Sequence, residues 1–221
     1  MPKNHIKRIS APRSWNIGRK KYNWVVRAKG PHKLEQCIPI AVLLRDMLKY
    51  AKILRDVKNI AMTKTLLVNG RGTRDINYGV GLMDIFEIPE LNEKYIIVLS
   101  KLGMITAVKT KADFKTAKII GKKKIGKKTQ LNLFGGENLI IEKDSYKTGD
   151  SIGLSLKDRK IKEHFKFEEG ASCFLTGGGH IGEFGKISKI EGKKIAVKSG
   201  EEEFETLKDF VYVTGGNLIE K

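Results

Sequence analysis

One stretch sets out the first folded module of the chain: residues 39–70 read PIAVLLRDMLKYAKILRDVKNIAMTKTLLVNG. Over Ile40–Ala51 the apolar residues recur at helical spacing, which predicts one amphipathic helix. A second, shorter helix is predicted around Arg55–Lys64. Leu66–Val68 then favours a strand, and Asn69-Gly70 is a strong signal for a tight hairpin turn. These patterns together predict a small module of two helices and a hairpin.

Beyond this turn the pattern is that of short β-strands separated by glycine-containing turns. The expected strands are Leu82–Ile88, Tyr95–Leu99, Met104–Val108, Lys118–Ile120, Leu131–Phe134, Leu139–Ile141, Ser151–Leu156, Ala171–Thr176, Gly185–Ile190, Lys194–Lys198, Glu203–Leu207 and Phe210–Thr214. The short, regular spacing of the last five is typical of a small closed β-barrel.

The 221 residues are therefore expected to form an α+β protein in four parts. Residues 1–36 are expected to form a basic extension, and residues 37–100 the module of two helices and a hairpin. Residues 101–167 are expected to form a central small β domain with a basic loop, and residues 168–221 a C-terminal β-barrel.

The net charge of +18 is carried by two segments. Residues 1–34 hold ten Lys or Arg and no acidic residue, and residues 109–128 hold nine Lys and one Asp. The rest of the chain is balanced, with 24 basic and 24 acidic residues. Blocks of one sign repel themselves and attract an external counter-charge. We therefore expect a polyanionic partner.

A nucleic acid fits this charge better than a membrane does. The longest clear apolar run, Cys37–Leu44, is far shorter than the roughly 20 residues that a spanning helix needs. The charged N-terminus has no apolar core behind it, so it does not resemble a secretory signal. Cys37 and Cys173 lie far apart, which favours free thiols in a reducing cytoplasm. We expect a cytoplasmic protein that does not bind membranes.

The candidate RNA-binding residues come from both basic segments and from the helical module. Trp15, Tyr22 and Trp24 are interleaved with the N-terminal cations, and aromatic rings can stack on bases while lysines hold phosphates. The candidates are Lys3, His5, Lys7, Arg8, Arg13, Trp15, Arg19, Lys20, Lys21, Arg27, Lys29, His32, Lys33, Arg45, Lys49, Arg55, Lys58, Arg71, Arg74, Lys122, Lys123, Lys124, Lys127 and Lys128.

Two expectations concern the order of these basic segments. Residues 1–36 are expected to be loosely ordered alone and ordered on RNA. The lysines between residues 122 and 128 are expected to form a mobile loop whose charge nothing nearby cancels. The alternative for both segments is an ordinary solvated surface, with the N-terminal aromatic side chains packed on the neighbouring domain.

The sequence predicts neither a catalytic site nor a metal site. Its four histidines lie on separate segments, and no spacing resembles a set of metal ligands. Gly177, Gly179 and Gly182 match the dinucleotide pattern G-x-G-x-x-G, but the residues that follow alternate like a strand instead of opening a helix. We expect a protein that is not an enzyme and needs no cofactor.

Four stretches resemble one protein family, in the same order along the chain. His5–Trp15, HIKRISAPRSW, is similar to the N-terminal signature of the small-subunit ribosomal protein four family of the archaeal and eukaryotic type. Gly30–Leu34, GPHKL, resembles that family too. Residues 37–100 are similar to its αL-type RNA-binding motif, and residues 177–190 resemble a KOW motif. No basic extension follows the expected barrel, which favours an archaeal source over a eukaryotic one.

This resemblance implies a structural constituent of the small ribosomal subunit that binds ribosomal RNA through a basic N-terminal arm and a lysine-rich loop. The partners it implies are small-subunit ribosomal RNA and neighbouring small-subunit proteins, with one copy per subunit. The alternative is a KOW-containing RNA-binding factor in transcription or ribosome assembly. An RNA-modifying enzyme would need a catalytic domain, for which the sequence offers no candidate residues.

Overall fold

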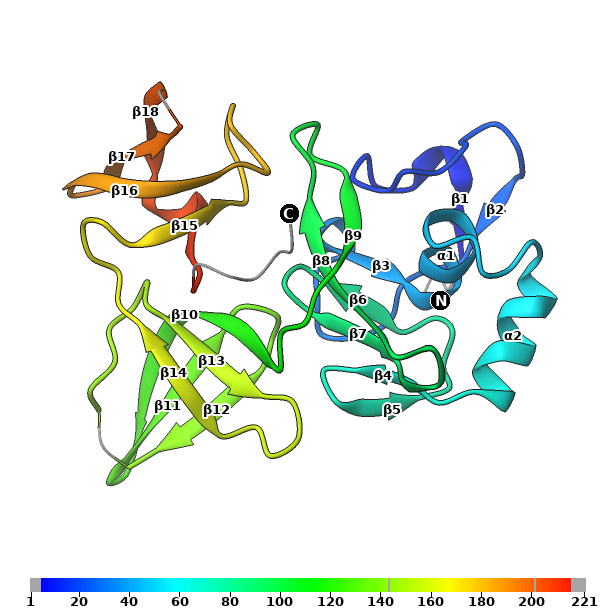
Figure 1. The fold of residues 1–221 in the computed structure, drawn as a ribbon, viewed down its shortest axis with the longest axis horizontal. Helices are drawn as coiled ribbons and strands as arrows, with labels where there is room; N and C mark the ends of the chain where they lie inside the picture. Colours follow the sequence, from blue (N-terminus) through cyan, green and yellow to red (C-terminus); the bar gives the residue numbers. More distant parts are fainter. Residues whose placement is uncertain (1–4, 143, 201, 216–221) are drawn as a thin grey trace. The chain divides into compact units, whose positions relative to one another are not determined.

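The computed structural model describes residues 5–142, 144–200 and 202–215. The chain forms two compact units, each built around its own β-sheets (Figure 1). Unit 1 comprises the residues up to Val98 together with Met104–Lys111, and unit 2 comprises Leu99–Gly103 and Ala112–Glu220. Among the described residues strands predominate, and helices are few and short. The expected mixture of helices and strands is confirmed, with a larger share of strand than the α+β class suggests.

Unit 1 contains one five-stranded sheet and two short strand pairs. The sheet has the order β5-β4-β7-β8-β9, and its strands are β4 Leu66–Val68, β5 Arg71–Thr73, β7 Ile85–Ile88, β8 Glu93–Leu99 and β9 Ile105–Lys109. The pairs join β1 Ile6–Lys7 to β2 Trp24–Val25, and β3 Cys37–Pro39 to β6 Gly79–Gly81. The predicted strand Leu82–Ile88 thus begins only at Ile85, and the residues that pair with β3, Gly79–Gly81, lie before the predicted strand.

The first helix is shorter than its apolar spacing predicts. It runs as α1 Ile40–Val42 and continues as a π-helical turn over Leu43–Met47. Lys49 then adopts a φ of 59°, which turns the chain out of the helix. Ala51 remains buried after this turn, so the apolar spacing continues past the point where the helix ends. The second predicted helix is confirmed as α2 Leu54–Thr63.

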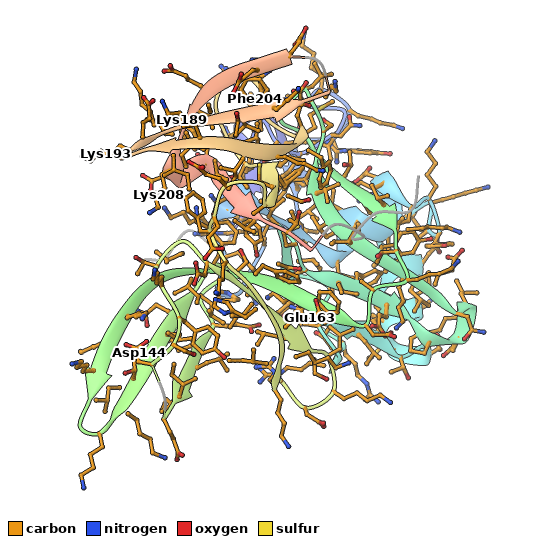
Figure 2. The ribbon with its side chains drawn as sticks, turned by 60° about the vertical axis from the view of Figure 1, so that its left-hand side comes forward. Asp144, Glu163, Lys189, Lys193, Phe204 and Lys208 are labelled. Carbon is orange, nitrogen blue, oxygen red and sulfur yellow. The ribbon has the colours of Figure 1, made fainter. Side chains whose placement is uncertain are left out.

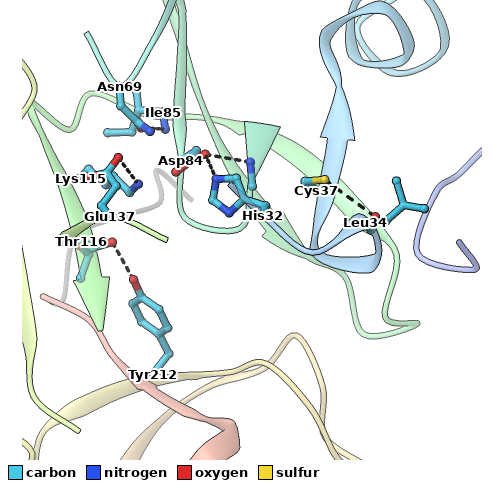
Figure 3. Close-up of polar contacts among 11 residues, drawn as sticks. His32, Leu34, Cys37, Asn69, Asp84, Ile85, Lys115, Thr116, Glu137 and Tyr212 are labelled. Carbon is cyan, nitrogen blue, oxygen red and sulfur yellow. Dashed lines mark hydrogen bonds and ion pairs between the residues drawn. The ribbon is translucent and has the colours of Figure 1, made fainter. Parts of the chain in front are cut away.

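Asn69-Gly70 forms the expected tight turn between β4 and β5. Both residues have positive φ angles, 51° and 74°, as a two-residue hairpin turn of this kind requires. The Asn69 side chain is buried, and its Oδ1 accepts a 2.9 Å hydrogen bond from the backbone N–H of Ile85 (Figure 3). The turn is therefore fixed to β7 by its own first residue.

Unit 2 contains two five-stranded antiparallel sheets. The first has the order β12-β11-β10-β13-β14, with β10 Phe114–Ile125, β11 Lys128–Leu133, β12 Asn138–Ile141, β13 Ser151–Ser155 and β14 Ile161–Phe165. Its core consists of Ala117, Ile119, Leu131, Leu133, Ile152 and Leu154. Strand β14 was not predicted, because three of its five residues are charged or polar and give no apolar alternation.

The predicted mobile loop around residues 122–128 is instead the outer half of a β-hairpin. Strand β10 is 12 residues long, and its outer half pairs with β11 as far as Ile125 and Lys128. Only Gly126 and Lys127 form the turn, and Gly126 adopts a φ of 59°. A glycine at this position allows the two strands to continue almost to the tip. We call residues 121–132 the lysine hairpin.

The second sheet of unit 2 has the order β18-β17-β16-β15-β19. Its strands are β15 Ser172–Leu175, β16 Phe184–Glu191, β17 Lys194–Ser199, β18 Glu202–Leu207 and β19 Val211–Val213. They surround a core of Cys173, Leu175, Ile187, Ile195, Val197, Val211 and Val213. The strands match the prediction, but in the described part of the chain β18 and β19 pair on one side only, so the barrel is not closed. A 3-10 turn at Lys208–Phe210 separates these two edge strands.

Candidate nucleic-acid interface

Arg8, a predicted RNA-binding residue, is buried inside unit 1 with only 2% of its surface exposed. Its Nε donates a 2.6 Å hydrogen bond to the carbonyl oxygen of Gly18. Its Nη2 lies 3.6 Å from a carboxylate oxygen of Asp46. A guanidinium group presents several donors in a rigid fork, which suits it to such a buried position. The Arg8 guanidinium therefore ties the N-terminal segment to the π-helical turn.

Arg19 also uses its guanidinium group within the fold. Its Nη1 donates hydrogen bonds to the carbonyl oxygens of Ile9 and Ala11, at 3.1 Å and 2.8 Å. Its Nη2 donates to the carbonyl oxygen of Pro12 at 2.9 Å. One side chain thus binds three carbonyl oxygens between residues 9 and 12, where the chain leaves the 3-10 turn Arg8–Ser10.

Trp15 is buried and is fixed by its indole N–H, although the sequence predicted it as an RNA contact. It is 2% exposed, and its Nε1 donates a 2.7 Å hydrogen bond to the carbonyl oxygen of Cys37. The neighbouring Ser14 accepts a 2.7 Å bond from the backbone N–H of Ile105. Residues 5–36 are accordingly folded onto unit 1, whereas the sequence suggested a loosely ordered arm.

His32 lies in a polar cluster at the start of β7. Its Nε2 is 2.8 Å from a carboxylate oxygen of Asp84, and the same carboxylate accepts a 2.8 Å bond from the backbone N–H of Gly81 (Figure 3). The imidazole is almost fully buried. His32 therefore holds the end of the N-terminal segment against β6.

The remaining predicted residues of this segment are exposed. They are His5, Lys7, Arg13, Lys20, Lys21, Arg27, Lys29 and Lys33. Two aromatic side chains lie among them, Tyr22 at 60% exposure and Trp24 at 53%. The structure thus buries Trp15 and exposes the two aromatic residues that the list of RNA contacts omitted. The predicted contact Lys3 falls outside the described residues.

The helical module also presents exposed cations. The exposed cations are Lys49, Arg55, Lys58, Arg71, which begins β5, and Arg74, which follows that strand. Arg45 is different, because its Nη2 lies 2.6 Å from a carboxylate oxygen of Asp46.

The lysine hairpin combines paired and unpaired cations. Lys122 forms an ion pair with Asp144, which lies beside the hairpin (Figure 2), and Lys128 forms one with Glu142 at 3.1 Å. The expectation that no nearby charge cancels the lysines is therefore wrong for these two. Lys123, Lys124 and Lys127 are exposed, and within the described part of the chain they have no ion-pair partner. Three cations thus remain available at the tip.

Two other lysines of the same basic segment point inward. Lys115 is buried and its Nζ lies 3.3 Å from a carboxylate oxygen of Glu137. The Nζ of Lys118 donates to the carbonyl oxygens that surround the 3-10 turn before β19, those of Lys208, Asp209 and Val211, at 2.7–3.2 Å. Burial lowers the pKa of Lys118 to about 8, and the neighbouring Asp209 opposes this shift.

Tyr212 forms further hydrogen bonds between β19 and β10, the two strands that Lys118 also joins. Its buried hydroxyl donates a 2.7 Å hydrogen bond to the carbonyl oxygen of Thr116 (Figure 3) and accepts a 3.1 Å bond from the backbone N–H of Lys118. The basic segment therefore serves two purposes in one strand: Lys118 attaches the first sheet of unit 2 to the second, and the outer lysines Lys123 and Lys124 face solvent.

Neither a membrane span nor a metal centre is found in the described part of the chain. None of the helices there is long and apolar enough to cross a bilayer. No group of three or more His, Cys, Asp or Glu side chains in these residues is arranged to hold a metal ion.

Comparisons of sequence identify relatives along nearly the whole chain. The RS4NT (NUC023) domain matches residues 1–35, and the ribosomal family S4e matches residues 91–161. The small ribosomal subunit protein eS4 of Methanococcus maripaludis is 37% identical, over 97% of this chain and 95% of that protein. The eS4 protein of Methanocaldococcus jannaschii is 38% identical over the same shares.

Comparison of structures gives the same result. The crystal structure of the 30S ribosomal protein S4e from Thermoplasma acidophilum matches with a TM-score of 0.70 and 33% identity, covering 81% of this chain and 95% of that one. Fold and sequence therefore agree on one class, the ribosomal proteins. With 37% identity over 97% of its length, the chain belongs to the S4e family of ribosomal proteins.

Proposed function

We propose that this protein is a structural constituent of the small ribosomal subunit and that it binds ribosomal RNA with cations from both units. The main support for RNA binding comes from the tip of the lysine hairpin. There Lys123, Lys124 and Lys127 are exposed, and in the described part of the chain they have no ion-pair partner. Membership of the S4e family supports the ribosomal assignment. Phosphate contacts of this kind orient a protein on RNA without reading its sequence.

The proposed surface differs from the predicted one in unit 1. The exposed lysines and arginines of residues 5–36 would meet phosphates, while Arg8, Trp15, Arg19 and His32 support them from within the fold.

We propose residues 37–100 as the αL-type module, supported by the order of two helices and the β4–β5 hairpin. We propose the sheet between residues 168 and 221 as the KOW-type domain. Neighbouring small-subunit proteins would be its other partners, at one copy per subunit.

The decisive experiment is sedimentation of the full chain with small subunits before and after a high-salt wash. We expect the protein to remain with the subunit, and a purified complex with small-subunit RNA to weaken steeply with salt. If about ten phosphates are contacted, affinity should fall roughly 10³- to 10⁵-fold between 50 and 200 mM salt. Recovery with RNA polymerase or only with assembly intermediates would instead indicate a factor that acts off the mature ribosome.

A further inference from the structure

A cavity of about 400 Å³ lies in unit 1 between the β1–β2 pair and the start of α2. Four cationic side chains line it, those of Arg8, Lys21, Arg45 and Lys52, together with the rings of Tyr22 and Trp24. Its size falls within the range of about 300–1,000 Å³ that is usual for small-molecule sites. These residues come from four separate stretches of the chain, so spacing in the sequence does not reveal the cavity.

The charge of this cavity favours an anion. Asp46 is the one acidic residue in its lining, and it is already engaged by Arg45 at 2.6 Å and by Arg8 at 3.6 Å. Lys21 and Lys52 are exposed at the rim. Four cations against one carboxylate leave an excess of positive charge facing the cavity, which attracts phosphate in particular.

The aromatic side chains favour a flat ring as the other part of the ligand. The ring of Trp24 meets His5 edge-on, with centroids 4.8 Å apart and planes at 86°. Tyr22 lies with its ring 5.5 Å from the guanidinium carbon of Arg8. Both rings are held by neighbours and are still more than half exposed. Exposed, preoriented aromatic rings beside cations are what proteins use to stack unpaired bases.

We propose that this cavity binds a single unpaired nucleotide of ribosomal RNA. Its base would stack on Trp24 or Tyr22, and its phosphate would meet Lys21, Lys52 and Arg45. Arg8 is a positioning residue, because it holds Tyr22 and Asp46 in place from below. The inference rests on the proposed binding of ribosomal RNA and adds a specific contact to it, one that recognises an unstacked base as well as charge.

The two tryptophans of the chain provide the test. Trp15 is 2% exposed and serves as an internal reference, whereas Trp24 is 53% exposed in the cavity. The full chain and its Trp24→Phe variant would be titrated with small-subunit ribosomal RNA and with a short unstructured single-stranded RNA. We expect both RNAs to quench the emission of the unsubstituted chain and to leave the variant's emission almost unchanged.

Affinity measurements on the same RNAs give a second readout. Trp24→Ala should weaken binding of the short RNA about 10- to 100-fold, as loss of one base stack does. Lys21→Ala should reduce the slope of log affinity against log salt by about 1, as expected for the loss of one phosphate contact. Lys20→Ala is the matched control, because Lys20 is equally exposed but does not line the cavity; it should leave the Trp24 quenching intact.

The outcomes separate this inference from the proposed function. If ribosomal RNA binds but Trp24 emission and the Trp24→Ala affinity stay unchanged, the nucleotide site is refuted while RNA binding stands. If the unsubstituted chain does not bind ribosomal RNA at all, the proposed function itself fails. If Trp24 becomes shielded from acrylamide only when small-subunit proteins are added, the cavity receives a protein partner and the proposal is overturned.

Discussion

The N-terminal segment and the lysine hairpin are both strongly basic in sequence, but their cations are used in different ways. In residues 5–36 the guanidinium groups of Arg8 and Arg19 are bound within unit 1. They donate hydrogen bonds to carbonyl oxygens, and Arg8 also pairs with a carboxylate. At the tip of the hairpin, Lys123, Lys124 and Lys127 extend into solvent. The planar fork of arginine can hold irregular backbone, whereas a lysine ammonium is strongly hydrated. A high density of positive charge in the sequence therefore does not by itself show that the cations are available to a partner.

This difference determines which experiments are informative. Deleting residues 1–34 would remove Trp15 and Arg8 from unit 1, and with them the bonds to Cys37 and Asp46. A loss of RNA binding in that variant would not distinguish lost contacts from a lost fold. Single substitutions in each region separate the two effects.

The largest effect is expected from Arg8→Ala. It removes a buried cation and leaves the carbonyl oxygen of Gly18 without its donor, which should lower the free energy of unfolding by about 3 kcal/mol. Urea denaturation followed by tryptophan fluorescence measures this, because both tryptophans lie in unit 1. Lys124→Ala is the matched control and should change stability by less than about 0.5 kcal/mol. Similar losses of unfolding free energy in the two variants would show that Arg8 is no more important for stability than an exposed lysine of the hairpin.

The second largest effect should come from the hairpin and should appear in binding alone. Replacing Lys123, Lys124 and Lys127 together by alanine should reduce the slope of log affinity against log salt by about 3, one per lysine. Affinity for small-subunit RNA should fall roughly 100-fold at low salt, with the stability unchanged. Filter binding over a series of salt concentrations would measure both quantities.

A matched set of lysines exists on the other sheet of unit 2. Lys189 and Lys193 are exposed on the β16–β17 hairpin (Figure 2), as is Lys194. Lys189 and Lys194 are paired with Glu191 and Glu205. Replacing these three lysines by alanine should change the salt slope by less than the first triple variant does. An equal change would show that the tip has no special part in binding.

A smaller effect is expected from Arg19→Lys, which keeps the charge and loses the fork. A lysine cannot donate to all three carbonyls that Arg19 satisfies, so stability should fall by about 1–2 kcal/mol. Thermal unfolding monitored by circular dichroism is sufficient to detect this. Unchanged stability would mean that the charge of Arg19, and not its geometry, matters.

The smallest effect is expected at the ion pair between Glu93 and Lys109, a lysine of the second basic segment. Hydrogen bonds from Lys109, Tyr50 and Tyr95 lower the pKa of Glu93 to about 2. A depressed carboxyl pKa contributes stability above the unfolded value of 4.5, and that stability is lost as the pH falls toward 2. Glu93→Gln should flatten the pH dependence of unfolding in this window. The change should be small because Lys109, the partner of Glu93, is exposed to solvent. An unaltered profile would contradict the lowered pKa of Glu93.

Much of the fold could be predicted from the sequence, because its strands carry clear apolar alternation and its turns carry glycine. The turn at Asn69-Gly70 and strands such as β4, β13 and β17 were found in this way. Strand β6, Gly79–Gly81, was missed because two of its three residues are glycine. The helix at Ile40–Ala51 was predicted too long, because local spacing does not reveal the positive φ of Lys49.

Less of the candidate site could be predicted. Charge counting located the basic segments, but it could not tell an arginine that bonds to carbonyl oxygens from one that faces solvent. The two outcomes depend on partners far along the chain, such as Asp46 for Arg8 and Cys37 for Trp15. Composition contains no information about such distant pairings. The RNA contacts themselves stay predictions until binding is measured.

The cluster of His32, Gly81 and Asp84 has a consequence for how sequences of this kind can diverge. A β-carbon built on Gly81 would lie 2.2 Å from the imidazole ring of His32. Any side chain at position 81 therefore collides with the ring, and removing the ring takes one contact away from the Asp84 carboxylate, which also accepts a hydrogen bond from the backbone N–H of Gly81. A side chain at position 81 therefore requires a smaller residue at position 32, which lies 49 residues away in the sequence. Sequence variation at position 81 should thus be accompanied by variation at position 32, so the two positions should covary among proteins that share this packing.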